Sequence, residues 1–380
     1  MMPTRNIGGA VQVHRVAVLI FFILFSSLNI IICAGNLLSD GSCSCSPWSG
    51  NQGSCCSGSA RNFCGSAFSK KQCGDATPVC CTSDFGSACC KVGEACSPGC
   101  RNTLKGSCGC LSQPSLDSVG WNRTHALRQL SFSAAAQCAA NDIVRWNCTA
   151  CVGKPLQEVA VVQNNSHLAF TAWDDAEKSI VVVLRGSLSI QDWLNNLNYF
   201  KTPAYGDLNC SDCNVHRGFL EAFQSLEPGI LKGVRDLSKT HPDFKTIMVT
   251  GHSLGAAMAA HTAIALKLVH GFEKISMPVY TFGQPRVGDA AFASWFHRIF
   301  PNWLRSVHWN DPVPHLAPAS FGFHHVGREI WWTEKSMPGE AIVCDGQGED
   351  PNCSASIVTA MVFTDHWYYL GKKVVQCAAF

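Results

Sequence analysis

The sequence predicts a protein of the α/β class, with helices on both faces of a central sheet, preceded by a small disulfide-rich module. Two observations support this prediction. From about residue 113 onward, short apolar runs alternate with amphipathic helical patterns, as they do when helices connect the strands of one sheet. Before that point, residues 43–110 hold fourteen of the 23 cysteines and few large apolar residues. We therefore expect a signal peptide over 1–35, a cysteine-rich module over 36–112 and one larger domain over 113–380.

The N-terminus has the pattern of a secretory signal peptide. Arg5 and Arg15 precede an unbroken apolar run over residues 16–25, and polar residues then interrupt the run before Ala34 and Gly35, where we place the cleavage. A membrane anchor is the alternative, but a membrane span needs about 20 continuous apolar residues. The pattern therefore predicts a secreted, extracellular protein, or one that stays in an endomembrane lumen.

The composition agrees with that compartment. Twenty-three cysteines indicate an oxidising environment, and removal of Cys33 with the signal peptide leaves an even number, 23 − 1 = 22. The chain is 47% apolar and 15% charged, which is a globular composition, and its formal net charge of +2 gives no reason to expect nucleic acid as a partner. Five glycosylation sequons mark expected surface positions: Asn122, Asn147, Asn164, Asn209 and Asn352.

The cysteine-rich module is too poor in apolar residues to build a core, so disulfides must hold it together. Their connectivity cannot be read from the sequence, and a zinc site is a minor alternative that the secretory context disfavours. Scattered aromatic residues either form a face that binds a surface or a carbohydrate, or pack the module: Trp48, Phe63, Phe68 and Phe85.

The larger domain shows its elements in order. An Ala-rich amphipathic stretch over 127–143 predicts the first helix. Apolar runs predict strands over 159–162, 168–173, 180–184, 279–282 and 304–309. A long helix that ends before Pro242 is predicted by apolar residues spaced by three and four, namely Phe219, Phe223, Leu226, Ile230, Val234 and Leu237. Residues 290–300 predict another helix, and the short turns between elements favour a single sheet.

A strand, a sharp turn and a helix are predicted around residues 247–268. An apolar run ends in Gly-His-Ser-Leu-Gly, with the serine at position 253, and an Ala-rich helical run follows. This is the context of a nucleophile elbow, in which the turn exposes a serine hydroxyl above the sheet. Side chains at positions 251 and 255 would collide with the neighbouring strand and helix, which explains the two glycines. The alternative is an ordinary strand-to-helix turn with a capping serine.

A serine nucleophile needs a base and an acid that orients the base, and in α/β-hydrolases they follow in the order Ser, Asp or Glu, His. Asp311 follows a predicted strand and precedes a rigid Pro-Val-Pro turn, and His366 lies near the C-terminus. The rival acids are Asp289, Asp345, Asp350 and Asp365. The rival bases are His297, His308, His315, His324 and His325. Order along the chain alone leaves the choice open.

Motifs throughout the larger domain resemble the secreted class 3 lipase family, the group of filamentous-fungus triacylglycerol lipases. The resemblance runs in order from about residue 118 to the end, and it rests on residues 183–187, 190–194, 216–219, 251–255, 281–288, 310–316, 321–325 and 365–368. The family usually has two glycines after the Ser-Leu pair, whereas this chain has Ala256 at the second position. The cysteine-rich module lies outside the resemblance.

The resemblance implies that residues 113–380 form a class 3 lipase catalytic domain with an α/β-hydrolase fold. It implies Ser253 as the nucleophile, Asp311 as the acid and His366 as the base. It also implies an oxyanion hole built from the backbone N–H and hydroxyl of Ser187 and the backbone N–H of Leu254.

The resemblance also organises the cysteines of this domain. It implies the disulfides Cys138–Cys377, Cys148–Cys151 and Cys344–Cys353. Cys210 and Cys213 then remain, and they are close enough in sequence to pair locally.

Residues 188–196, directly after Ser187, are predicted to form a mobile lid. Ile190, Trp193 and Leu194 fall on one side at helical spacing, opposite polar residues. As a lid, this apolar stripe would cover the serine in water and turn outward at a lipid surface. A plain surface helix packed permanently on the domain is the alternative.

Together these features predict a secreted serine esterase that acts on lipid esters through an acyl-enzyme, with triacylglycerol as the favoured substrate. A phospholipase or a feruloyl-type esterase is the alternative within this class, and a non-catalytic surface-binding protein is the alternative outside it. We expect no cofactor and no metal. The expected partner is an ester at the surface of a lipid droplet or membrane.

Overall fold

The structure is a computed structural model of the 380-residue chain, and it describes residues 114–187, 198–333, 341–357 and 362–377. Before residue 113 it describes only short paired strands: β1 (Asn36–Leu37) with β2 (Cys43–Ser44), β3 (Phe63–Cys64) with β4 (Lys71–Gln72), β5 (Val79–Ser83) with β6 (Gly86–Cys90), and β7 (Glu94–Cys96) with β8 (Cys110–Ser112). The chain divides into two compact units. The smaller comprises Met1–Cys89 and Pro98–Gly109, and the larger comprises Cys90–Ser97 and Cys110–Phe380. The β7–β8 pair thus groups with the larger unit.

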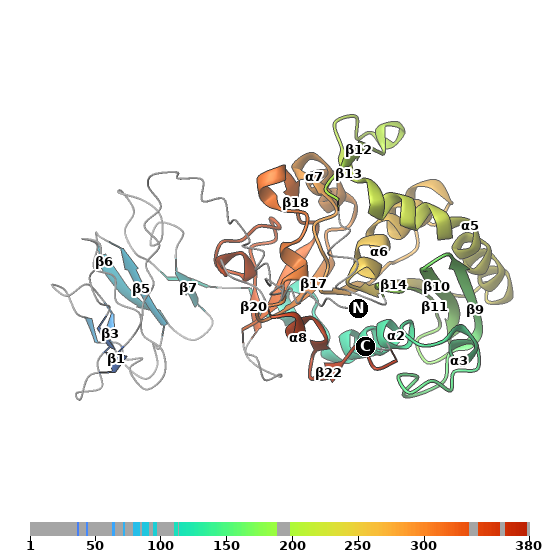
Figure 1. Cartoon of the computed structure of the whole chain (residues 1–380), viewed down its shortest axis with the longest axis horizontal. Coiled ribbons are helices and arrows are strands. Elements are labelled where there is room, and N and C mark those ends of the chain that lie inside the picture. Colours follow the sequence, from blue (N-terminus) through green and yellow to red (C-terminus); the bar gives the residue numbers. More distant parts are fainter. Residues whose placement is uncertain are drawn as a thin grey trace, which may run out of the picture. The chain divides into compact units, whose positions relative to one another are not determined.

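An eight-stranded sheet forms the centre of the larger unit (Figure 1). Its strands lie in the order β20 (Ala341–Val343), β19 (Arg328–Trp332), β17 (Trp303–His308), β15 (Val279–Phe282), β14 (Thr246–His252), β11 (Ser179–Leu184), β10 (His167–Asp174) and β9 (Gln157–Asn164). The five strands from β19 to β11 run parallel, and antiparallel strands extend both edges. Because parallel strands end at the same edge of a sheet, the residues that follow β11, β14 and β17 come together there.

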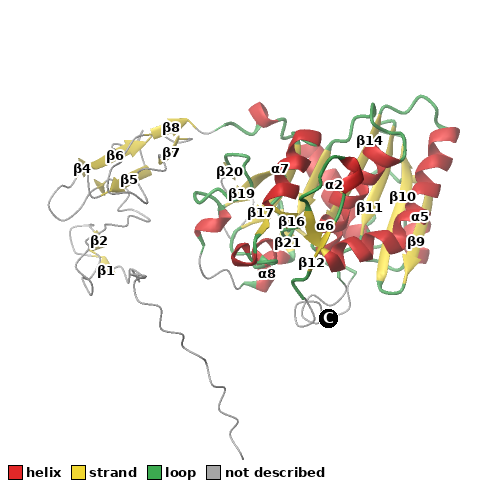
Figure 2. Ribbon diagram, turned by 90° about the horizontal axis from the view of Figure 1, so that it is seen from above, coloured by secondary structure: helices red, strands yellow, loops and turns green. Residues whose placement is uncertain are grey.

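Helices cover both faces of this sheet (Figure 2), which confirms the predicted architecture. One face carries α5 (Arg217–Thr240), α6 (Leu254–Ile264) and α7 (Ala290–Ile299), and the other carries α2 (Arg123–Ala135) and α3 (Ala140–Val144). The alternation of side chains along β11 explains the two cores. Ile180, Val182 and Leu184 belong to the first core, and Val181 and Val183 belong to the second.

Smaller elements complete the larger unit. A four-stranded sheet contains β12 (Lys201–Pro203), β13 (Asn214–His216), β16 (Gly288–Asp289) and β18 (Phe323–His324). The C-terminal part contains the single-turn helix α8 (Phe363–His366) and the strand pair β21 (Tyr368–Tyr369) and β22 (Lys372–Lys373).

The elements differ from the sequence prediction in three places. The first predicted helix is interrupted, because α2 ends at Ala135 and α3 begins at Ala140, and the break places Cys138 where it bonds Cys377. Helix α6 passes into a single π-helical turn, Ala265–Val269. Strands β19 and β20 extend the sheet beyond the predicted ones.

Four disulfides lie in the described part of the larger unit: Cys138–Cys377, Cys148–Cys151, Cys210–Cys213 and Cys344–Cys353. The three pairings that the resemblance implied are therefore confirmed, and the two remaining cysteines also pair. Cys138–Cys377 spans 239 residues of sequence and ties the C-terminal segment to the end of α2.

The described residues also bear on the surface and on membranes. Four sequon asparagines are exposed, namely Asn122, Asn147, Asn164 and Asn209, whereas Asn352 is half-buried. Within the described ranges, none of the helices combines the length and the apolar character that crossing a bilayer requires.

Candidate active site

Ser253 occupies a sharp turn between the end of β14 and the start of α6. Its backbone angles are φ 60° and ψ −130°, a conformation that costs a non-glycine residue on the order of 1–3 kcal/mol. The backbone N–H of Ser253 donates to the carbonyl of Phe282 on β15 at 3.0 Å, which holds the strained turn against the sheet. Such strain is often found at functional sites, where the surrounding structure maintains it.

Two glycines make this turn possible, for the reason that the sequence suggested. A Cβ atom on Gly255 would lie 2.1 Å from the carbonyl oxygen of Leu184 on β11. A Cβ atom on Gly251 would lie 2.4 Å from the backbone of Gly255. Both distances are far inside van der Waals contact, so helix and strand can approach this closely only without side chains. Ala256, where the family usually has its second glycine, fits into the core without exposed surface.

Asp311 and His366 form a buried pair at the same edge of the sheet. Asp311 comes shortly after β17, and its backbone N–H donates to the carbonyl of His308 at 2.9 Å. His366 ends α8, and its Nδ1 lies 2.7 Å from Asp311 Oδ2. Neither side chain is exposed. Because a carboxylate oxygen accepts this bond, Nδ1 carries the proton and Nε2 is left to accept one.

Three groups keep the Asp311 carboxylate ionised. Burial by itself raises the pKa of Asp311, but His366, Tyr369 and the N–H of Val313 together outweigh burial and lower that pKa below its usual value. The Tyr369 hydroxyl donates to Oδ2, and the Val313 N–H donates to Oδ1 at 2.8 Å. An ionised carboxylate in this position can orient the imidazole and stabilise its protonated form.

No hydrogen bond within the described residues occupies the two atoms that would exchange a proton, Ser253 Oγ and His366 Nε2. Among the described residues, Ser253 Oγ and His366 Nε2 are both buried and have no hydrogen-bond partner. His252, the residue before Ser253, packs its ring against that of His366 with 4.2 Å between the centroids, which brings the base beside the turn. Gly283 permits this approach, because a Cβ there would lie 2.7 Å from His366 Cε1. A serine next to a histidine that a carboxylate orients is the set of groups that nucleophilic catalysis requires.

The backbone that follows β11 also comes close to the turn. β11 runs parallel to β14, and Gly186, just after β11, passes so close that a Cβ there would lie 3.2 Å from Ser253 Cβ. Ser187 is the next residue, so its backbone reaches the neighbourhood of the serine. Leu254 begins α6, where backbone N–H groups have no partner within the helix and the helix dipole is positive. Donors placed in this way can stabilise negative charge on an ester oxygen.

The sequence also predicted lid residues and several rival acids and bases. Ile190, Trp193 and Leu194 of the predicted lid lie outside the described residues. Among the rival carboxylates, Asp289 caps α7 by accepting from the Phe292 N–H at 2.9 Å. Among the rival histidines, His325 bonds the carbonyl of Pro314 and His324 lies beside the carbonyl of Gln347, both at 2.8 Å. Asp311 and His366, the acid and histidine that the resemblance implied, are in direct hydrogen-bond contact.

Tyr369 is a site residue that the sequence analysis missed. Its hydroxyl bonds the same Asp311 oxygen that accepts from His366, and its side chain is fully buried. Burial and the nearby Asp311 charge raise the pKa of this hydroxyl well above its ordinary value, so it remains a donor. The available signal was its position three residues after His366 in an aromatic stretch.

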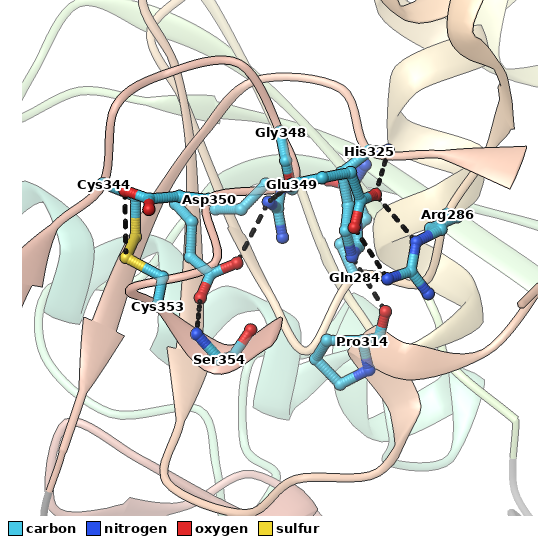
Figure 3. A network of polar contacts seen from close by, with 12 residues as sticks. Gln284, Arg286, Pro314, His325, Cys344, Gly348, Glu349, Asp350, Cys353 and Ser354 are labelled. Carbon is cyan, nitrogen blue, oxygen red and sulfur yellow. Dashed lines mark hydrogen bonds and ion pairs between the residues drawn. A yellow bond between two sulfur atoms is a disulfide. The ribbon is translucent and has the colours of Figure 1, made fainter. Parts of the chain in front are cut away.

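A buried ionic network, also not predicted, supports the turn after Asp311 (Figure 3). Arg286 donates from Nε and Nη2 to the two carboxylate oxygens of Glu349 at 2.7 and 2.8 Å. Its Nη1 donates to the carbonyl of His315 at 2.9 Å. Glu349 lies in the loop that the Cys344–Cys353 disulfide closes.

His325 joins this network to the same turn. Its backbone N–H donates to Glu349 Oε1 at 2.9 Å, and its Nε2 donates to the carbonyl of Pro314 at 2.8 Å. The network therefore fixes consecutive carbonyls of the segment that leads away from Asp311, at Pro314 and His315. The net contribution of a buried charge pair to stability depends on good geometry and on further hydrogen bonds to the charged groups.

The parallel sheet, the strained turn at Ser253 and the buried acid–histidine pair define a protein of the α/β-hydrolase class. Comparison with known proteins narrows this class. Residues 181–321 match the family described as Lipase (class 3). The chain is 37% identical over 238 residues to a lipase of Rhizomucor miehei, and 37% identical over 186 residues to the secreted mono- and diacylglycerol lipase 1 of Fusarium solani.

The matched regions have different extents. They cover 61% of this chain and 64% of the Rhizomucor miehei sequence, and 47% of this chain and 53% of the Fusarium solani sequence, so the chain spans less than two thirds of both curated relatives. A solved structure of Rhizomucor miehei triacylglyceride lipase superposes with a TM-score of 0.60 at 33% identity, covering 67% of this chain and 96% of that one. The chain belongs to the class 3 lipase family, a family of carboxylic ester hydrolases.

We predict that the free energy of unfolding falls as the pH drops below about 6.5. Burial lowers the pKa of His216 to about 4 and the pKa of His252 and His261 to about 3. Below the ordinary histidine pKa, the unfolded chain binds these protons and the folded chain does not, so protonation favours unfolding. Each fully depressed histidine contributes a slope of about 1.4 kcal/mol per pH unit.

Urea unfolding between pH 7.5 and pH 5 measures this slope. His261 Nδ1 forms a hydrogen bond of 2.6 Å with the Tyr205 hydroxyl. Asparagine places a polar side-chain atom near the position of Nδ1 but does not titrate. The variant His261→Asn should therefore show a shallower slope than the parent protein. A free energy of unfolding that stays constant over this range would contradict the prediction.

Proposed function

We propose that this protein is a secreted serine esterase that hydrolyses esters at lipid surfaces, with triacylglycerol as its substrate. The observation that carries the proposal is the buried Asp311–His366 pair beside the strained turn at Ser253. Membership of the class 3 lipase family supports an ester as substrate, and the names of the Rhizomucor miehei and Fusarium solani relatives support an acylglycerol.

The geometry supports an acyl-transfer mechanism. His366 Nε2 takes the proton from Ser253 Oγ as that oxygen attacks the ester carbonyl carbon. The backbone N–H groups of Ser187 and Leu254, with the Ser187 hydroxyl, bind the oxyanion that forms. His366 then gives the proton to the leaving alcohol oxygen as the ester bond breaks, and Asp311 stabilises the imidazolium in between. Water repeats these steps on the acyl-enzyme and releases the fatty acid.

We also propose that residues 188–196 are a lid. Their position directly after Ser187 supports this, because Gly186, the residue before Ser187, lies against the turn at Ser253. In water, the stripe of Ile190, Trp193 and Leu194 covers the serine, and at a lipid surface it turns outward because an interface favours exposed aromatic area.

The test of both proposals is hydrolysis by the purified secreted protein. Triolein and tributyrin should be hydrolysed faster than phosphatidylcholine or methyl ferulate, whereas the reverse order would assign a phospholipase or a feruloyl-type esterase. With tributyrin, the rate should rise abruptly at the solubility limit, and Trp193→Ser should reduce this rise more than it reduces hydrolysis of dissolved ester. A smooth saturation curve through the limit in both proteins would contradict the lid.

The cysteine-rich module, residues 36–112, is proposed to localise or protect the enzyme rather than to take part in catalysis. The cysteine density of this stretch, and the position of every proposed catalytic residue after residue 113, support this role. Limited proteolysis near residue 112 should yield a fragment that hydrolyses dissolved short-chain ester as fast as the intact protein. A folded fragment without that activity would show that the module is needed for catalysis.

A further inference from the structure

Two buried histidines donate to consecutive backbone carbonyls of the short helix that carries His366. His252, at the end of β14, lies with Nε2 at 2.8 Å from the carbonyl oxygen of His366. His308, at the end of β17, lies with Nδ1 at 2.8 Å from the carbonyl oxygen of Asp365. Both side chains are almost completely buried, at 1% and 2% exposure. A carbonyl can only accept, so each bond fixes which ring nitrogen carries the hydrogen.

These bonds compensate for a weakness of α8. The helix has only four residues, and the carbonyls at the end of a helix have no partner within it. An isolated single turn is unstable, because its first hydrogen bond must fix several backbone dihedrals. The strands β14 and β17 flank β15 in the sheet, so the two donors hold α8 from two rigid supports.

The same rings also contact the aromatic residue behind the acid. Tyr369 lies edge-on to His252 and to His308, with centroid separations of 5.7 and 5.9 Å. Its hydroxyl bonds Asp311. The histidines therefore contact both parts of the charge pair, the backbone of His366 and the tyrosine that holds Asp311.

We propose that His252 and His308 are positioning residues for the base: through hydrogen bonds to the carbonyls of residues 366 and 365, they fix α8 so that His366 Nδ1 faces Asp311 and Nε2 faces Ser253. This inference rests on the proposed function, in which His366 is the base. A displacement of about 1 Å in a catalytic group can reduce turnover about 100-fold, so the loss of either bond acts mainly on kcat.

The proposal makes an atom-specific prediction, because the two histidines use different ring nitrogens. Nε2 lies far from the backbone, where the amide nitrogen of glutamine can reach, and Nδ1 lies near the backbone, where the amide nitrogen of asparagine can reach. His252→Gln and His308→Asn should therefore keep the donors in place. His252→Asn and His308→Gln are matched controls with the same chemistry and a misplaced donor.

Kinetics on dissolved tributyrin test this pattern. We expect His252→Ala and His308→Ala to lower kcat about 10- to 100-fold with little change in KM. His252→Gln and His308→Asn should recover most of that loss, and the two controls should not. His270→Ala, which removes a histidine that pairs with Glu227, should leave kcat unchanged. Equal activity of the Gln and Asn variants at each position would overturn the proposal, even if the alanine variants fail to fold.

A readout without substrate separates this inference from the proposed function. Proton NMR of the parent protein should show a downfield signal from the His366 Nδ1–H bonded to Asp311, absent in His366→Gln. The signal should be lost or shifted in His252→Asn and His308→Gln, and it should be unchanged in His252→Gln and His308→Asn. An unchanged signal in all four variants overturns the inference. A parent protein that shows the signal but hydrolyses no ester overturns the proposed function instead.

Discussion

Replacing Ser253 by alanine should leave a folded protein in which kcat for ester hydrolysis is lower by about 10⁶-fold. The side chain has no hydrogen-bond partner among the described residues, so its removal breaks no structural bond. It also takes away the only atom in the proposed mechanism that forms the acyl-enzyme. Hydrolysis of a dissolved ester, together with circular dichroism and thermal unfolding, measures both parts of this expectation.

Two variants of the partners and one control complete the experiment. His366→Ala should lose a similar factor, and Asp311→Asn should lose about 10⁴-fold, because the amide favours the wrong tautomer of the histidine. Ser294→Ala changes an exposed serine on α7 and should keep full activity. Near-normal esterase activity in Ser253→Ala would exclude Ser253 as the nucleophile.

Replacing Arg286 by methionine should lower the free energy of unfolding by about 3–5 kcal/mol. Arg286 is 6% exposed, and its loss would leave the half-buried Glu349 carboxylate without its cation and the His315 carbonyl without a donor. Urea unfolding at pH 7.5 measures the effect. The double variant Arg286→Met/Glu349→Leu should recover a large part of the loss, because replacement of both members of a buried ion pair removes the unpaired charge as well.

The matched control for Arg286 is an exposed ion pair. Lys232 and Asp236 lie one turn apart on α5, with 78% and 52% of their side chains exposed. Exposed pairs of this kind contribute a few tenths of a kcal/mol, so Lys232→Met should have an effect below about 0.5 kcal/mol. If Arg286→Met destabilised the protein no more than Lys232→Met does, the buried network would not have the importance that its geometry indicates.

The elements that the sequence predicted best are those with a strong period or a strong steric demand. The apolar positions from Phe219 to Leu237 repeat at helical spacing and all lie on the buried side of α5. The glycines at 251 and 255 predicted a close approach of strand and helix, and the distances at both positions show it. In both cases a local rule determines the structure, so no knowledge of distant contacts was needed.

The features that were missed depend on contacts between distant segments. β19 begins with Arg328 and Glu329, and this charged start does not have the apolar pattern of a buried strand, although Glu329 is buried against Arg305 of β17. Arg286 and Glu349 are 63 residues apart in sequence, so no local pattern could join them. The choice of Asp311 and His366 among their rivals likewise came from the family resemblance and not from spacing.

The Cys138–Cys377 disulfide has a consequence for the proposed base. His366 lies only 377 − 366 = 11 residues before Cys377. The covalent bond to Cys138 anchors the segment that carries His366 to the residues just after α2. If β21 and β22 separate locally, this covalent anchor limits how far α8 can move from the strands that support it, so we expect α8 to re-form readily. A thiol reductant should thus shorten the half-life of the enzyme's activity in solution at concentrations that leave the initial rate unchanged.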